Sequence, residues 1–112
     1  MRRAVRASVV SAAIILFVGM TSEVGAQTIS GVGTKECGVY IQAVKLKSDV
    51  AINGFVSWAQ GYLSGFNATN ADGRDVVIDP AGLNYWLTNY CSAHQNEAFY
   101  LAMQQLIKEL AH

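Results

Sequence analysis

Few residues in this sequence could carry out chemistry, and two of them lie close together. Cys91 and His94 have a spacing that a zinc ion could use if the cysteine were a free thiol. No serine has the strand-turn-helix setting of a G-x-S-x-G motif, and a histidine near an acidic residue such as Glu97 is common by chance. We therefore predict no catalytic residues and expect that the protein is not an enzyme.

A second polar cluster has part of the pattern of a calcium loop. Gly73 could supply the fixed glycine of an EF-hand. Asn70, Asp72 and Asp79 would then fall at the third, fifth and twelfth ligand positions. The first position would be Ala68, which has no side-chain oxygen, and the last ligand would be Asp instead of the longer Glu. We interpret this segment as a polar connection, and we expect no metal and no cofactor.

Residues 1–26 have the pattern of a secretory signal peptide. Arginines at positions 2, 3 and 6 precede a mostly apolar run over residues 9–20, and small residues end the segment at Ala26. The apolar run has about twelve residues, fewer than the roughly 20 that a membrane-spanning helix needs. We expect cleavage after Ala26, export to the periplasm of a bacterium, and no stable membrane insertion afterwards.

The charge of the mature chain, residues 27–112, argues against a nucleic-acid partner. Signal removal takes away three of the eight basic and one of the eight acidic residues. Five basic minus seven acidic residues gives a net charge of −2. Nucleic-acid binding depends on clustered Lys and Arg contacts to phosphate, and the chain has no basic stripe to supply them.

Cys37 and Cys91 are the only cysteines, and both belong to the mature chain. Export brings them into an oxidising compartment, where such a pair normally forms a disulfide. Two cysteines allow a single connectivity, so we predict a Cys37–Cys91 bond instead of a zinc site. Closing a loop of about 54 residues should stabilise the fold by roughly 4 kcal/mol in the chain-entropy model.

The element that carries the first cysteine has helical periodicity. Apolar residues recur at i, i+3, i+4 and i+7, at Cys37, Tyr40, Ile41 and Val44. This spacing predicts a helix over residues 35–48, with Thr34 as its N-cap. Residues 27–34 are small and mostly polar and contain two glycines, so we expect a flexible leader.

The stretch FVSWAQGYLSGFN, residues 55–67, predicts the central core helix. Its apolar stripe runs without a gap through Phe55, Trp58, Ala59, Tyr62, Leu63 and Phe66. Gly61 and Gly65 lie four positions apart and therefore share a face. We expect this face to pack closely against a neighbouring backbone, which would offset the low helix propensity of glycine.

Two more helices follow a polar connection over residues 67–78. Asp79-Pro80 is an N-cap residue followed by proline at the first helical position, and residues 92–95 have the form of a capping box that opens the last helix. The buried faces are predicted to be Leu83, Trp86, Leu87, Tyr90 and Cys91, and then Phe99, Met103, Leu106, Ile107 and Leu110. The sequence thus predicts an all-α fold, a compact bundle of about four short helices in a single domain over residues 35–112.

The mature chain has ten aromatic residues, more than four short helices are expected to cover. We therefore expect some rings to form a surface that binds other proteins. The candidate protein-binding residues are Trp58, Tyr62, Phe66, Tyr85, Trp86 and Tyr90.

The order of landmarks resembles the HdeA family of periplasmic acid-stress chaperones. WAQGY at residues 58–62 and DPAGL at residues 79–83 lie between Cys37 and Cys91, and Phe99 follows eight positions later. The resemblance implies a small helical protein that is a homodimer at neutral pH. It also implies that acid separates and partly unfolds the dimer, which then holds denatured proteins in solution as a stress response. The terminal helix differs from that family in having one basic residue, Lys108.

A second resemblance is to the periplasmic immunity proteins that block type VI secretion amidases. It rests on the aromatic helix with glycines, and on Y-C-x-x-H at residues 90–94 leading into the terminal helix. This resemblance implies an inhibitor that needs no pH switch. The connection over residues 67–78 would be the part that enters the cleft of the cognate effector enzyme.

Overall fold

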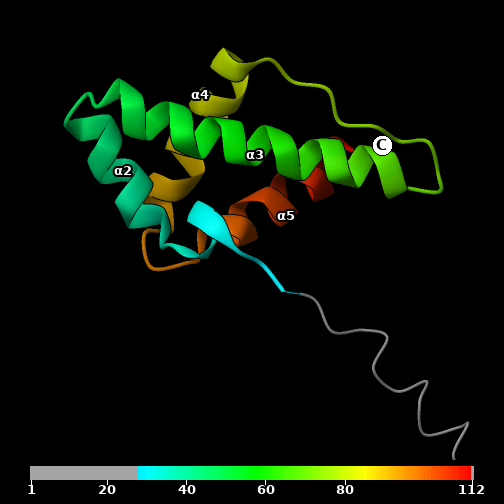
Figure 1. Ribbon diagram of the computed structural model, residues 1–112, viewed down its shortest axis with the longest axis horizontal. Helices are drawn as coiled ribbons and strands as arrows, with labels where there is room; N and C mark the ends of the chain where they lie inside the picture. The colour runs from blue at the N-terminus through cyan, green and yellow to red at the C-terminus, as the bar shows by residue number, and fades with distance from the viewer. Residues whose placement is uncertain (1–27, 112) are drawn as a thin grey trace, which may run out of the picture.

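A helix of 21 residues is the platform on which the other elements pack. The computed structural model describes residues 28–111, so the predicted export signal and His112 lie outside the described range. Within that range, one 3-10 turn precedes four α-helices (Figure 1). The elements are η2 (Gly31–Thr34), α2 (Cys37–Lys45), α3 (Asp49–Thr69), α4 (Pro80–Ala93) and α5 (Phe99–Leu110). The predicted all-α fold is confirmed.

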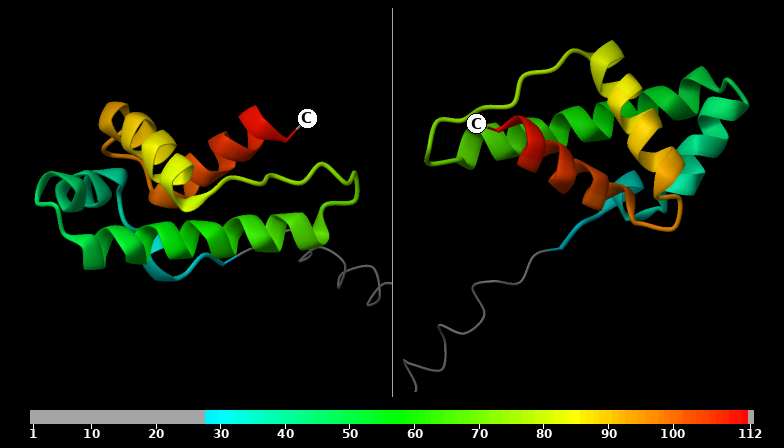
Figure 2. Two further views of the ribbon diagram at one scale, coloured as in Figure 1. Left: turned by 90° about the horizontal axis from the view of Figure 1, so that it is seen from above. Right: turned by 180° about the vertical axis from the view of Figure 1, so that it is seen from behind.

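The elements are arranged around α3. Figure 2 shows α4 and α5 in a V-shaped layer on one side of α3, and α2 beside the N-terminal half of α3. All the other elements, η2 included, contact α3, and η2 also contacts α5. The segment over residues 70–79 returns from the end of α3 to the start of α4 (Figure 1). One helix therefore supplies packing surface to every other element.

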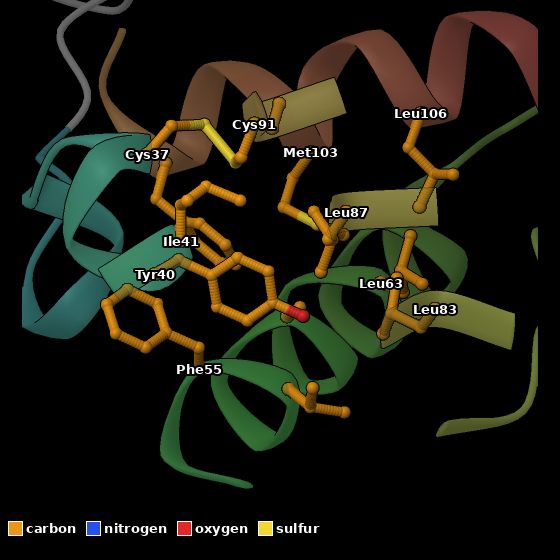
Figure 3. Close-up of a cluster of buried hydrophobic side chains, with 14 of the residues drawn as sticks. Cys37, Tyr40, Ile41, Phe55, Leu63, Leu83, Leu87, Cys91, Met103 and Leu106 are labelled. Atoms are coloured by element: carbon orange, nitrogen blue, oxygen red, sulfur yellow. A yellow bond between two sulfur atoms is a disulfide. The ribbon is translucent and has the colours of Figure 1, made fainter. Parts of the chain in front are cut away.

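Three aromatic rings from three helices form one end of the core. The Tyr40 ring of α2 lies 5.3 Å from the Phe55 ring of α3 and 5.5 Å from the Phe99 ring of α5. The Phe55 and Phe99 rings are 4.9 Å apart in an edge-to-face arrangement, which favours their packing beyond the burial of area. Aliphatic side chains continue the core (Figure 3); they include Leu63, Leu83, Leu87, Met103 and Leu106.

The apolar faces predicted from periodicity match this core closely. On α3, Phe55, Ala59 and Leu63 are buried, and the remaining aromatic residues of the stripe are half-buried against the core. The exception is Leu110 at the end of α5, which is 40% exposed instead of buried. It occupies the last turn of the helix, where no other element covers it.

The predicted Cys37–Cys91 disulfide is confirmed. Both cysteines are fully buried and their Cα atoms are 4.9 Å apart, within the range that a disulfide normally spans. The bond joins the first residue of α2 to the last turn of α4 (Figure 3). Two helices that are distant in the sequence are thereby fixed at one end of the core.

The predicted start of α4 is confirmed. Pro80 is the first helical residue, and the backbone N–H of Gly82 donates to Asp79 Oδ1 at 2.7 Å. The carboxylate thus satisfies one of the four N–H groups that a helix start leaves without a partner, and its charge suits the positive end of the helix dipole.

The first helix is shorter than the predicted range of residues 35–48. It ends at Lys45 because Lys47 adopts a left-handed conformation with φ of 53°. Ser48 then caps α3, accepting from the N–H of Ala51 at 3.4 Å. Thr34 is not the N-cap of α2, since its hydroxyl donates to the carbonyl of Gly31 within η2. Periodicity located the buried face correctly but not the helix ends.

The capping box predicted at residues 92–95 is wrong. α4 continues through Ala93, where Ser92 donates its hydroxyl to the Thr88 carbonyl, and α5 begins only at Phe99. The reason is a long-range contact, because carbonyls of the connection cap the start of α2. The N–H groups of Cys37 and Gly38 donate to the carbonyls of residues 97 and 95 at 2.7 and 2.8 Å.

The glycine face predicted to pack on a neighbour is open. Gly61 and Gly65 are exposed, and a Cβ placed on either would meet no heavy atom within 4 Å. The other elements lie against the aromatic stripe, so the glycines face away from them.

Among residues 28–111, no helix is both long enough and apolar enough to cross a membrane.

Removal of the disulfide is expected to unfold or severely weaken the domain. Replacement of both cysteines by alanine avoids a free thiol and should cost roughly 4 kcal/mol, because the unfolded chain regains the entropy of an open loop. Circular dichroism melting would show a fall of at least about 15 °C in Tm. A Tm within a few degrees of the parent protein would show that the bond contributes little to the fold.

Replacement of Gly61 by alanine is expected to leave the fold unchanged or to stabilise it by about 0.5–1 kcal/mol, because alanine is the better helix former and has free space there. Gly33→Ala is the matched comparison. Its Cβ would lie 2.1 Å from the indole of Trp58, and we expect a loss of about 1–3 kcal/mol. Urea unfolding of both variants measures the difference, and destabilisation by Gly61→Ala would mean that its face is covered.

Candidate functional site

The structure separates the six candidate protein-binding residues into two groups. Trp58, Tyr62 and Phe66 are half-buried on α3, whereas the other three lie on α4. A ring contact joins Trp58 to Tyr62 and another joins Trp86 to Tyr90, and among residues 28–111 none connects one group with the other. The predicted aromatic surface is therefore two surfaces, which we describe in turn.

The α3 group lies beneath the segment expected to be a flexible leader. Residues 28–34, here called the N-terminal strap, pack on the ring of Trp58, and residues 31–34 form η2. The Trp58 Nε1–H donates to the carbonyl of Ser30 at 2.9 Å. The same ring lies 5.4 Å from Tyr62 and 6.0 Å from Phe99. The indole thus joins the strap to the core.

Two glycines allow the N-terminal strap to approach Trp58 so closely. A Cβ at Gly33 would lie 2.1 Å from indole carbons, far inside van der Waals contact. Gly31 has a φ of +82°, a conformation that favours glycine, and its Cβ would lie 3.0 Å from the indole nitrogen. The two glycines that suggested flexibility in the sequence are required by a close contact.

Beyond Tyr62, which contacts the Trp58 ring, residues of α3 and α5 line a groove. Ile29 of the strap lies in it, beside a depression of about 290 Å³. The other residues that line the depression are Tyr62, Phe66, Thr69 and Ile107. None of these side chains carries a charge, and Val32 of the strap also packs on the core. The side chains that line this groove are uncharged and mostly apolar, with polar atoms also exposed among them, and a short segment of the chain lies against it.

The α4 group contains a ladder of stacked rings. Trp86 and Tyr90 are 5.2 Å apart with nearly parallel planes, and Tyr90 and His94 are 4.0 Å apart, also stacked. The three residues recur every four positions, which places them on one face of α4. Tyr85 is not part of this ladder, and it is 73% exposed.

Two carboxylates accept hydrogen bonds from rings of this ladder. Tyr90 Oη–H donates to Glu97 Oε1 at 2.8 Å, and Trp86 Nε1–H donates to Glu109 Oε1 at 3.1 Å. Burial raises the pKa of Tyr90 to about 12, helped by the hydrogen bond to Glu97 and by the negative charges of Glu97 and Glu109. His94 Nδ1 lies 2.8 Å from the carbonyl of Tyr90 at the end of the helix.

The connection between α3 and α4 is anchored by asparagine side chains. The Asn67 amide donates to the carbonyl of Val76 at 3.0 Å and accepts from the N–H of the same residue at 2.9 Å. Asn70 Oδ1 accepts from the N–H groups of Asp72 and Arg74. Val76 is buried, whereas the next residue, Val77, is 89% exposed. The segment is therefore a braced loop with an apolar side chain at its surface.

The residues considered for metal binding have other roles. Cys91 is bonded to Cys37, Asp72 pairs with Arg74 at 3.1 Å, and Asp79 caps α4. In the described part of the chain, no group of three or more His, Cys, Asp or Glu residues is placed to hold a metal ion.

No family model, curated protein or solved structure matches this chain. The resemblances to acid-stress chaperones and to immunity proteins therefore rest on the sequence landmarks alone.

Sequence reasoning missed the N-terminal strap, the carboxylate contacts and the part that His94 takes in the ladder. The spacing of Trp86, Tyr90 and His94 was a usable signal, because i, i+4 and i+8 positions align on a helix. The partners Glu97 and Glu109 come from beyond α4, and no spacing rule identifies them. The glycines at 31 and 33 gave no sign of the ring that they contact.

We expect Tyr90 to ionise about two pH units above the ordinary value for tyrosine, about 10. Because its pKa is raised in the folded state, the stabilisation linked to this proton is complete below about pH 10. It is lost as the pH rises toward 12. The difference in absorbance at 295 nm between the parent protein and Tyr90→Phe measures this ionisation. Glu97→Gln should lower the pKa, whereas Glu36→Gln, an exposed site on the N-cap of α2, should not. A Tyr90 transition near pH 10 in the parent protein would contradict the role assigned to Glu97.

Proposed function

We propose that this protein is an exported periplasmic binding protein that holds other, denatured proteins at low pH, as acid-stress chaperones do. The observation that supports this proposal is the anchoring of α4 by three carboxylates. Asp79 caps its first turn, Glu97 accepts from Tyr90, and Glu109 accepts from Trp86. The helix that carries half of the candidate binding residues thus depends on groups that acid neutralises.

Acid should weaken this arrangement in two ways. Hydrogen bonds to a charged carboxylate are about twice as strong as neutral ones, so protonation weakens all three anchors. Between about pH 7 and about pH 2 the mature chain would also change from a net charge of −2 to about +7, from five Lys and Arg plus two His. Repulsion among these charges favours an expanded state. Release of α4 and its ladder would make apolar rings available to a denatured client.

The disulfide is compatible with partial unfolding of this kind. Because Cys37 and Cys91 remain joined, loosening of α4 leaves its last turn attached to α2. The chain would therefore unfold only partly, and its aromatic rings would become accessible. The resemblance to acid-stress chaperones also implies a homodimer at neutral pH, which sedimentation velocity at pH 7 and at pH 2 would detect.

The test follows light scattering of an acid-denatured client protein between pH 7 and pH 2, with and without the purified oxidised protein. We expect suppression only in acid. The double variant Glu97→Gln, Glu109→Gln should suppress aggregation at a higher pH than the parent protein, because its ladder already lacks charged anchors. Glu36→Gln removes an exposed carboxylate that has no capping hydrogen bond and should behave like the parent. Intact helicity without suppression at pH 2 would rule out this function.

The braced loop supports a second candidate, an immunity-type inhibitor of a periplasmic effector enzyme. A loop that is already rigid loses little entropy on binding, and that is the property an inhibitor needs. The bond pair between Asn67 and Val76 supplies this rigidity, and Val77 would be the contact residue. The resemblance to immunity proteins points to the same loop.

For this candidate the expected partner is an effector enzyme encoded beside the protein. Val77→Asp should weaken its inhibition at least about tenfold, because a charge would enter the interface. Val50→Asp, at a side chain that is 87% exposed on α3, is the control and should inhibit normally. Equal inhibition by both variants would exclude the loop as the inhibitory element.

A further inference from the structure

The N-terminal strap shows what kind of ligand the groove on α3 and α5 accepts. Residues 28–34 carry no charge, and of their two apolar side chains, Val32 packs on the core and Ile29 lines the groove. Small residues lie where the strap passes the indole of Trp58. The carbonyl of Ser30 accepts the indole N–H. A short uncharged segment of another protein could make the same contacts.

We propose that the ring of Trp58 and the adjoining groove, lined by Tyr62, Phe66 and Ile107, form a binding site for short uncharged apolar segments of denatured proteins. The N-terminal strap occupies it in competition with them. The proposal deepens the proposed chaperone function and rests on it for the identity of the ligand. It assigns the α3 group of candidate residues to client binding and gives the α4 group no part in this site.

The strap is held in a way that permits exchange. A single side-chain hydrogen bond, from Trp58 to Ser30, joins residues 28–34 to α3. Two other hydrogen bonds, from the Thr34 hydroxyl to the Gly31 carbonyl and from the Lys35 N–H to the Val32 carbonyl, are local and do not join the strap to another helix. Ile29 is only half-buried and leaves a depression beside it. Gly33 is the only buried residue among residues 28–34. Segments with few buried residues open locally without global unfolding, so the groove can be vacated while the core remains intact.

The remaining depression gives a second reason to expect an external ligand. Tyr62, Phe66 and Thr69 line it together with Ile29, so the strap leaves part of these side chains uncovered. A client segment with one more apolar side chain would cover more of these rings than the strap does. Its advantage over the strap would come from this additional contact.

Competition within one chain makes the site weak for external ligands until the strap is released. A segment tethered by a short linker has an effective concentration in the millimolar range at its own site. An external peptide of equal intrinsic affinity must exceed that concentration to compete with the strap. Displacement of the strap should therefore raise the apparent affinity for an external segment, and this effect distinguishes a binding groove from ordinary structural packing.

The experiment measures binding of a fluorescent peptide with the sequence of residues 28–34, TISGVGT, and uncharged ends, at pH 7. Gly33→Ala is the test variant, because its Cβ would overlap the indole and displace the strap, and Gly61→Ala is the matched control with open space. We expect the peptide to bind Gly33→Ala at least about tenfold more tightly than the parent protein or Gly61→Ala. A peptide with serine in place of its isoleucine and valine should bind none of them.

Release of the strap is checked independently. In a Trp86→Phe background, Trp58 is the sole tryptophan, and its emission should shift to the red in Gly33→Ala. If Gly33→Ala does not fold, the double variant Ile29→Ser, Val32→Ser removes the apolar contacts without steric overlap and should give the same gain in affinity. Because neither the peptide nor the side chains that line the groove carry a charge, the gain in peptide affinity should not depend on salt concentration.

Two outcomes would overturn the proposal. One is unchanged Trp58 emission in both strap variants, which would mean that the strap does not cover the ring. The other is a displaced strap with no gain in peptide affinity, which would make the contact structural. Failure of the chaperone function gives a different result, namely tight peptide binding by Gly33→Ala without suppression of client aggregation at pH 2.

Discussion

The fold depends on the junction where α2, α4 and the connection before α5 meet. There the Cys37–Cys91 bond fixes the start of α2 to the end of α4, and the first N–H groups of α2 are satisfied by carbonyls of residues 95 and 97. A helix of nine residues is too short to be stable alone in water. At this junction a covalent bond and two long-range hydrogen bonds provide the stability that so short a helix lacks.

The same junction positions both aromatic surfaces. It sets where α4 ends and therefore places His94 in stacking contact with Tyr90. It also directs the connection so that Glu97 reaches the hydroxyl of Tyr90. On the other side, the pairing of Phe99 N–H with the carbonyl of Lys35 brings the chain that precedes α2 alongside α5. The strap lies against Trp58 because this pairing aligns it.

Sequence reasoning was reliable where a rule acts within one helix. The stripe from Phe55 to Phe66 and the cap at Asp79 follow from spacing and local chemistry, and both agree with the structure. It failed where the deciding partner is distant in the chain. The capping box at 92–95 was a reasonable local pattern, but the chain after α4 instead supplies the carbonyls of residues 95 and 97 to α2. Gly61 and Gly33 could not be distinguished either, because only the fold determines which one meets Trp58.

The position of the disulfide also divides the molecule topologically. Between Cys37 and Cys91 the chain forms a covalent ring that contains α2, all of α3 and nearly all of α4. The N-terminal strap and α5 are two tails that leave this ring at adjacent points. The tails pair with each other there, through the bridge between Glu36 and Ala98. Separation of the tails would expose apolar surface on α3, whereas the length and connectivity of the ring would not change.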